Sequence, residues 1–295
     1  MKILDREVKC ISRSDVWNIY PLGDLHIGSK NCAEKKIRAH VKRIQQDKRG
    51  LWFGGGDILD AIKPQDAKRF DIQTLPDWLL EGDAEETRDK LSDIIDQQFC
   101  RAVEILKPVA PRCLGLIEGN HERTIRRLYN ENIHKGLCNR LKTVDLTAYC
   151  WLRLRFKMRG LARVIHIVAC HGFGGGRSEG AEPNHLGRML KKWAHADILF
   201  RGHSHTYHVM PPKPVLYVPA NGKIPDELKL KYIYAANWGC WLYSHAAGAS
   251  TYDEVADYPA RPMMTEFAAI QPFYHTTENG KDKPYPKIEI RSVEI

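Results

Sequence analysis

Five short blocks of the chain gather carboxylate, amide and imidazole side chains, and each follows an apolar run typical of a β-strand. They are Gly23-Asp24-Leu25-His26, Gly55-Gly56-Asp57, Gly119-Asn120-His121-Glu122, Cys170-His171-Gly172 and Gly202-His203-Ser204-His205. Because residues two apart in an extended segment point the same way, Asp24 and His26 can reach one cation. Asp57 offers two carboxylate oxygens, enough to bridge two ions about 3.5–4 Å apart. The blocks therefore predict a centre for two divalent cations.

The remaining donors narrow the choice of metal. Asn120 offers an amide oxygen, and the last two blocks offer the imidazole nitrogens of His171, His203 and His205. A mixed nitrogen and oxygen set without thiolate suits manganese, iron, zinc, cobalt or nickel better than an all-oxygen magnesium site. Two such cations together activate a water molecule for attack on the phosphorus of a phosphate ester, so the sequence predicts a two-metal phosphoesterase.

The order of apolar runs indicates an α/β protein with its donors on loops at strand ends. Strand patterns at 16–22, 51–53, 113–117, 164–169 and 197–200 alternate with helical patterns at 33–49, from about 84 to 107, and at 184–195. The last third of the chain is mostly strand. We expect a single domain over residues 1–295, with an insertion over the site at about 61–83 and a strand-rich C-terminal part.

Capping and turn residues refine these boundaries. Asp83, with Glu86 three residues later, is expected to cap the helix that begins near residue 84, and Asn184 to cap the helix over 184–195. Asn221-Gly222 and Asn279-Gly280 are typical of hairpin turns. The glycine run 174–176 lacks the Lys-Ser/Thr ending of a P-loop, which favours a simple turn.

Composition excludes membrane and disulfide-rich classes. Of 295 residues, 43% are hydrophobic and 27% charged, and no apolar run reaches the roughly 20 residues of a membrane helix. The first residues carry charges and form no apolar signal core. The eight cysteines are dispersed without a C-x-x-C pair, so reduced thiols are expected. We expect a cytoplasmic protein with no membrane partner; its oligomeric state is left open.

The net charge of +9 is compatible with a polyanionic partner such as nucleic acid. Arg123, Arg126 and Arg127 directly follow the Asn120-His121 block and are candidates for substrate binding, with a solvated helix face as the alternative. A second cluster alternates along 150–159 and comprises Arg153, Arg155, Lys157 and Arg159. Either an edge strand that avoids aggregation or a track for a nucleic-acid backbone explains this stripe. The acidic segment 71–96 argues against a uniformly basic surface.

Taken together, the five blocks resemble the calcineurin-like metallophosphoesterases, whose pattern is G-D-x-H, G-D, G-N-H-(E/D), H and G-H-x-H in that order. The resemblance spans residues 23–205. It implies two packed mixed β-sheets flanked by helices, with two divalent metal ions, manganese first among them, at the loop ends. It implies two ligand sets that share Asp57: Asp24, His26, Asp57 and His205 for one ion, and Asp57, Asn120, His171 and His203 for the other.

The same resemblance implies that His121 is not a ligand but stabilises the phosphoryl group or protonates the leaving oxygen. A metal-bridging hydroxide would attack phosphorus in line. The chain departs from the protein-serine/threonine phosphatase branch, because Ile58-Leu59-Asp60-Ala61 follows Asp57 where that branch has an Arg. Residues 61–83 and the last 90 residues match no branch, so the resemblance leaves the substrate open.

The basic net charge and the clustered arginines make nucleic acid or nucleotides the first substrates to consider, so we expect a phosphodiesterase that acts on them. The alternatives are a phosphomonoesterase acting on nucleotides or small phosphate esters, and a scaffold that binds partners without turnover. Glu122 is expected to serve chiefly as a favourable acid in the first turn of a helix, and Asp60 to be structural. The histidines outside the five blocks are expected to be surface or core groups; these are His40, His134, His166, His185, His195, His208, His245 and His275.

Overall fold

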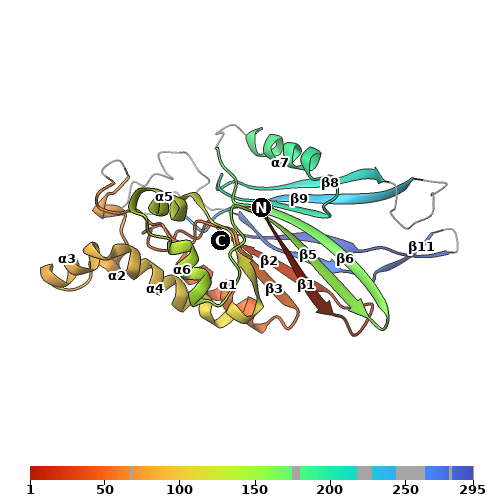
Figure 1. Cartoon of the computed structure of the whole chain (residues 1–295), viewed down its shortest axis with the longest axis horizontal. Helices are drawn as coiled ribbons and strands as arrows, with labels where there is room; N and C mark the ends of the chain where they lie inside the picture. Colours follow the sequence, from red (N-terminus) through yellow and green to blue (C-terminus); the bar gives the residue numbers. More distant parts are fainter. Residues whose placement is uncertain (67–68, 175–179, 218–227, 244–262, 279–280, 295) are drawn as a thin grey trace.

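Two mixed β-sheets packed face to face form the centre of the molecule, with helices on their outer faces (Figure 1). The computed structural model describes residues 1–66, 69–174, 180–217, 228–243, 263–278 and 281–294. The architecture is the α/β sandwich of two packed mixed sheets that the resemblance implies.

The first sheet has six strands in the order β1-β5-β6-β7-β9-β8. Their bounds are β1 Lys2–Lys9, β5 Tyr149–Met158, β6 Leu161–Cys170, β7 Ile198–Arg201, β9 Lys229–Trp238 and β8 Tyr207–Tyr217. The pairs β5–β6 and β8–β9 are antiparallel, whereas β1–β5, β6–β7 and β7–β9 are parallel. The sheet therefore has β1 and β8 as its edge strands.

The second sheet has five strands in the order β13-β10-β2-β3-β4. Their bounds are β13 Lys287–Glu294, β10 Met263–Gln271, β2 Trp17–Leu22, β3 Gly50–Gly54 and β4 Cys113–Leu116. Strands β2, β3 and β4 run parallel, and β10 is antiparallel to both of its neighbours. A separate antiparallel hairpin joins β11 (His275–Glu278) to β12 (Lys281–Pro284).

Helices cover the outer faces of both sheets. The helical layer of the second sheet comprises α1 Glu34–Gln46, α4 Ile94–Leu106, η2 Lys107–Arg112, α5 Asn120–Tyr129 and α6 Ile133–Arg140. Before α4 in the chain come η1 Ile72–Thr74, α2 Asp77–Leu80 and α3 Ala84–Ser92, of which α3 packs against α2 and α4. Helix α7 (Ala181–Lys192) covers the first sheet and lies over β8 and β9 (Figure 1). The α1 helix buries one apolar face, formed by Ile37, Val41 and Ile44 at helical spacing.

Between the sheets lies a core of large, fully buried side chains, among them Phe53, Phe156, Phe200 and Trp238. Burial of this apolar surface fixes the two sheets against each other. The strands β2, β3, β4, β6 and β7 end on one side of this core, and the five donor blocks follow their carboxyl ends directly. The sheets therefore bring together five loops that are distant in sequence.

Two helical expectations are wrong in part. The helix expected from about 84 to 107 is two helices, because Asp93 between them has non-helical dihedral angles (φ −110°, ψ 31°) and the Ser92 hydroxyl donates to the backbone of Asp89. Asp83 does cap α3, by accepting from the backbone of Glu85 and Glu86. Helix α7 begins at Ala181 rather than 184, since Pro183 is tolerated in a first turn, and Asn184 is not its cap.

The basic stripe of β5 does not lie on an edge strand, because β1 pairs in parallel beside it. The alternating pattern itself is correct. Arg153 Nε donates to Asp5 Oδ1 of β1 at 2.6 Å, and Lys157 Nζ lies 2.6 Å from Glu7 Oε2. Carboxylates of the neighbouring strand thus neutralise two of the four cations, and the edge-strand explanation is wrong.

Part of the insertion at 61–83 packs firmly on the helical layer: Leu75 and Leu79 are buried in its core. All eight cysteines are free thiols. Among the described residues, no helix is long and apolar enough to cross a membrane. The expected turns at Asn221-Gly222 and Asn279-Gly280, most of the glycine run 174–176, and His245 lie outside the described residues.

Candidate metal centre

One group of donors comes from the loops after β2 and β7. His26 Nε2 and His205 Nε2 face each other at 3.1 Å, and Asp24 Oδ1 lies 3.4 Å from His205 Nε2. All three side chains are buried. Two imidazoles whose Nε2 atoms point at one spot, beside a carboxylate oxygen, form an arrangement suited to a cation.

A second group comes from the loops after β3, β4, β6 and β7. His171 Nε2 lies 3.1 Å from Asp57 Oδ2 and 2.8 Å from Asn120 Oδ1. His203 completes this group, with its ring 5.2 Å from that of His171 and a ligand nitrogen within 4.8 Å of the other donors. The nitrogen and oxygen atoms converge in the manner of the first group.

Asp57 lies between the two groups. Its Oδ2 atom is 3.1 Å from His171 Nε2 on one side and 4.0 Å from His26 Nε2 on the other. Its Oδ1 atom accepts a 2.9 Å hydrogen bond from the backbone of His121, which fixes the carboxylate plane. A single carboxylate that reaches both groups is what a bridging ligand requires.

His121 sits beside Asp57, with Nε2 4.0 Å from Asp57 Oδ2. Its other nitrogen, Nδ1, is hydrogen-bonded to the backbone carbonyl of Asp60. A carbonyl can only accept, so Nδ1 carries the proton and Nε2 is the nitrogen that faces the donors. Asp60 Oδ1 also lies 3.4 Å from His26 Nδ1. Asp60, for which a surface or structural role was expected, therefore supports the site instead, because it orients two histidines.

The backbone of the centre is strained where the donors project. Asp24, His26, Asp57, His203 and His205 all have positive φ, between 48° and 76°. Such conformations cost energy in residues other than glycine, and they persist where surrounding contacts hold them. These contacts are exceptionally close. A Cβ atom on Gly119, for example, would lie 2.1 Å from both the backbone nitrogen and Oδ1 of Asp57.

Trp238 of β9 forms the floor beneath three of the loops, and sequence reasoning did not find it. Its ring is fully buried and lies so close to Gly23, Gly55 and Gly202 that a Cβ atom on any of them would clash. The indole nitrogen donates a 2.6 Å hydrogen bond to Asp24 Oδ2. Trp238 thereby orients a donor from the side away from the cation. The only available signal was three glycines placed beside donors.

Glu122 performs more than the helix role expected for it. Its carboxylate accepts from the backbone nitrogens of Asp57, Ile58, Leu59 and Gly119 at 2.7–3.1 Å. Burial and the nearby charge of Asp57 raise the pKa of this buried carboxyl. One side chain thus caps the start of α5 and ties the second block to the third.

A buried ion pair supports the fifth block. Arg201 Nη1 donates to Glu182 Oε2 of α7 at 2.7 Å, and the same oxygen accepts from the Ser204 hydroxyl at 2.7 Å. Ser204 Oγ in turn accepts from Asn237 Nδ2 at 2.7 Å. This network fixes the residue between His203 and His205. None of its members other than Ser204 lies in a block, so the sequence offered no signal for it.

The charges of neighbouring donors shift one another's pKa values. Burial disfavours the ionised form of Asp57, but the charges of His171, His121 and His26 outweigh it and hold its pKa well below the usual value. For His171, burial is outweighed by the charges of Asp57 and Asp24, which raise its pKa to about 9. Burial and the charge of His171 lower the pKa of His203 to about 4. The centre therefore holds carboxylates ionised, as metal ligands must be.

The chemistry of the donor set fits divalent cations. Seven side chains from five loops, buried or half-buried, provide two carboxylates, one amide oxygen and four imidazoles. Asp24 Oδ1 is buried and accepts no hydrogen bond among the described residues. A buried carboxylate oxygen without a hydrogen-bond donor destabilises the folded protein unless a cation binds it. The structure thus brings together all seven residues expected as ligands, and His121 with them.

The arginines expected to bind substrate lie on α5, which begins at Asn120 in the centre. Glu118 binds two of them: its carboxylate accepts from Arg126 Nε at 2.8 Å and lies 3.4 Å from Arg123 Nε. The negative charge of Glu118 weakens the attraction of these two arginines for a phosphate group. Arg127 is exposed and, among the described residues, is not in an ion pair.

No protein-family model matches the chain, and no curated protein matches it. Among solved structures, it is similar to a predicted phosphoesterase from Streptococcus pneumoniae at 13% identity and a TM-score of 0.33, over 94% of this chain and 99% of that one. It is also similar to vacuolar protein sorting 29 from Cryptosporidium parvum, at 14% identity and 0.38, over 94% and 99%.

A third similar structure is the NAD nucleotidase of Haemophilus influenzae, at 10% identity and a TM-score of 0.39, over 95% of this chain and 50% of that one. These similarities are weak. The two packed sheets and the convergence of the five ordered blocks agree, on their own geometry, with the resemblance to the calcineurin-like metallophosphoesterases.

Proposed function

We propose that this protein is a two-metal phosphoesterase that hydrolyses phosphodiesters, with nucleic acid or nucleotides as substrates. The observation that carries the proposal is the position of Asp57 between two converging donor groups, each with histidines on its far side. Two divalent cations held there would supply Lewis-acid activation of water and of the phosphoryl oxygens.

The chain's own residues provide the remaining functions. Asp57 and Asp24 supply negative charge that holds cations close together. His121 Nε2 faces the donors because Asp60 holds Nδ1. With Nδ1 protonated, Nε2 donates to a phosphoryl oxygen, or passes a proton to the leaving oxygen, when the ring is in its imidazolium form. The buried supports, Trp238 and Glu122, keep the donors in place before substrate binds, and such preorganisation lowers the cost of charge development.

The preference for diesters over monoesters rests on charge. The protein carries a net charge of +9, which favours a polyanionic substrate. Complete donor groups also favour an enzyme over a binding scaffold, because none of the seven ligand positions that the resemblance implies is substituted. Manganese is the first metal to test, since the nitrogen and oxygen donors suit it.

The test measures hydrolysis of a chromogenic diester and a chromogenic monoester with the same leaving group, together with single- and double-stranded DNA and RNA. We expect manganese-loaded protein to cleave the diester and a nucleic acid, to lose both activities with chelator and to regain them with manganese. The His195→Gln variant, which alters an exposed imidazole outside the centre, should match the wild type. Cleavage of the monoester alone would assign a monoesterase, and no turnover of any substrate would favour the scaffold.

A further inference from the structure

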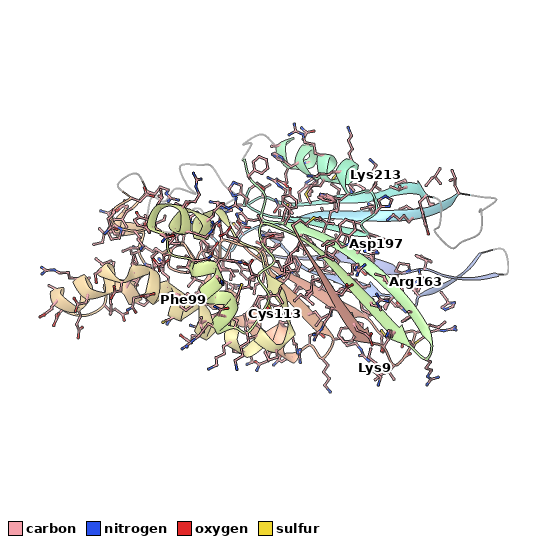
Figure 2. All side chains as sticks on the ribbon, in the orientation of Figure 1. Lys9, Phe99, Cys113, Arg163, Asp197 and Lys213 are labelled. Atoms are coloured by element: carbon pink, nitrogen blue, oxygen red, sulfur yellow. The ribbon has the colours of Figure 1, made fainter. Side chains whose placement is uncertain are left out.

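A groove lies between α7 and the edge strand β8, outside the metal centre. It encloses about 560 Å³, and its lining combines Pro183, Asn184, Gly187, Arg188, Leu190 and Lys191 of α7 with Met210, Pro211 and Lys213 of β8. Residues 184, 187, 188 and 191 recur at helical spacing, so one face of α7 forms one wall. Figure 2 labels Lys213 on β8.

The groove is positively charged and has no opposing acid of its own. Arg188, Lys191 and Lys213 are exposed, and none pairs with a carboxylate among the described residues. The acids of neighbouring segments are already occupied: Glu182 binds Arg201, and Asp197 lies 3.6 Å from Lys231 Nζ. Three cations in one groove attract a chain of negative charges.

The groove also lies along the chain segments that lead away from the centre. β8 begins two residues after His205, and Lys213 follows His205 by eight residues, about 26 Å or less of extended chain. Helix α7 is joined to the same block by the Glu182–Ser204 hydrogen bond. A strand of a few nucleotides can therefore reach the groove while one of its phosphates occupies the centre.

We propose that the α7–β8 groove binds the phosphate backbone of a single-stranded nucleic acid whose scissile phosphate lies at the metal centre. Apolar atoms of Met210 and Pro211 in the same lining suit sugar and base surfaces. An edge strand that carries Pro211, Pro212 and Pro214 is poorly suited to pairing with a further strand. The inference rests on the proposed function for the position of the cleaved bond, but the binding surface is independent of turnover.

The test compares two variants with equal loss of charge. The groove variant combines Arg188→Gln, Lys191→Gln and Lys213→Gln, and the control combines Lys35→Gln, Lys36→Gln and Lys42→Gln on the exposed face of α1, over the other sheet. Binding of a fluorescent 12-nucleotide DNA strand is measured by anisotropy, with chelator present, across a series of salt concentrations.

We expect the groove variant to bind about tenfold or more weakly at low salt, and the slope of log affinity against log salt to shrink by about 2, as loss of three phosphate contacts on a single strand predicts. The control should bind as the wild type does. In manganese, cleavage of the oligonucleotide relative to the chromogenic diester should fall about tenfold in the groove variant.

Equal binding by the groove variant and the wild type would overturn the proposal, as would an equal loss in the control. Inorganic polyphosphate of matched charge that competes as strongly as the oligonucleotide would also overturn it, because the groove would then select charge alone. A failure of the proposed function gives a different result: the diester is not cleaved, while the binding difference between the two variants remains.

Discussion

The metal centre and the positively charged surface of this protein are built in opposite ways. In the centre, the donors are buried or half-buried, and hydrogen bonds from other residues orient many of them, as Trp238 orients Asp24. On the surface, the cations are exposed and differ chiefly in whether an acid neutralises them. Glu118 neutralises two arginines of α5, whereas the cations of the α7–β8 groove lack such partners among the described residues.

A donor motif at the end of a strand is therefore a good guide to the metal centre, whereas cations that lie close together in sequence are a poor guide to a binding surface. A donor block can bind a metal because the end of a strand fixes the position of its side chains. A cation on the surface attracts a phosphate strongly only if no carboxylate neutralises it, and that depends on acidic residues elsewhere in the chain.

Asp57→Asn should give the largest effect. The change removes the charge of the carboxylate that lies between both donor groups, so bound metal and turnover should fall together, with kcat lowered about 10³-fold or more. Metal content by elemental analysis and diester hydrolysis measure the two effects. A variant that kept full metal content and activity would show that Asp57 is not shared.

His121→Ala should separate metal binding from chemistry. Its Nε2 atom faces the donors, but the resemblance assigns it a role toward substrate, so metal content should stay at the wild-type level while kcat falls about 10²-fold. The same two measurements apply. Loss of metal in this variant would instead make His121 a ligand.

Trp238→Phe keeps a ring beneath the glycine loops and removes the donor to Asp24 Oδ2. We expect metal affinity to fall about 10- to 100-fold, the usual cost of losing a group that orients a ligand. Competition with a metallochromic chelator measures it. Unchanged affinity would mean that the strained loop alone holds Asp24.

His40 provides a buried imidazole outside the centre. Burial, aided by the charge of Arg43, lowers its pKa to about 4. The unfolded chain therefore binds more protons between pH 6.5 and 4, so this group contributes stability above pH 6.5 that is lost as pH falls. His40→Phe should reduce the loss of unfolding free energy between pH 7 and 5 by about 2 kcal/mol, measured by urea unfolding. An identical pH dependence in both proteins would contradict this cause.

Arg126→Gln should give the smallest effect. Because Glu118 already binds this arginine, oligonucleotide affinity should change less than about threefold. Anisotropy under the conditions used for the groove variant allows direct comparison. A loss as large as that of the groove variant would place the nucleic-acid surface on α5.

Much of the centre could be predicted because each donor block stands at a strand end and the parallel strands carry these ends to one place. The supports could not, since Trp238 and Glu182 are far from the donors in sequence and meet them only after the sheets pack. Asp60 was misjudged because its backbone carbonyl, which no sequence pattern marks, holds His121. The helix over 84–107 was misjudged because a single residue, Asp93, breaks it.

The most direct test of the central claim is a count of metal ions per chain. Metal-free protein would be dialysed to equilibrium against manganese, and bound ions counted by elemental analysis, with the magnetic coupling between them read by electron paramagnetic resonance. We expect two ions per chain that are magnetically coupled, as ions about 3.5–4 Å apart through Asp57 should be. One ion per chain, or two that are uncoupled, would contradict a shared dinuclear centre.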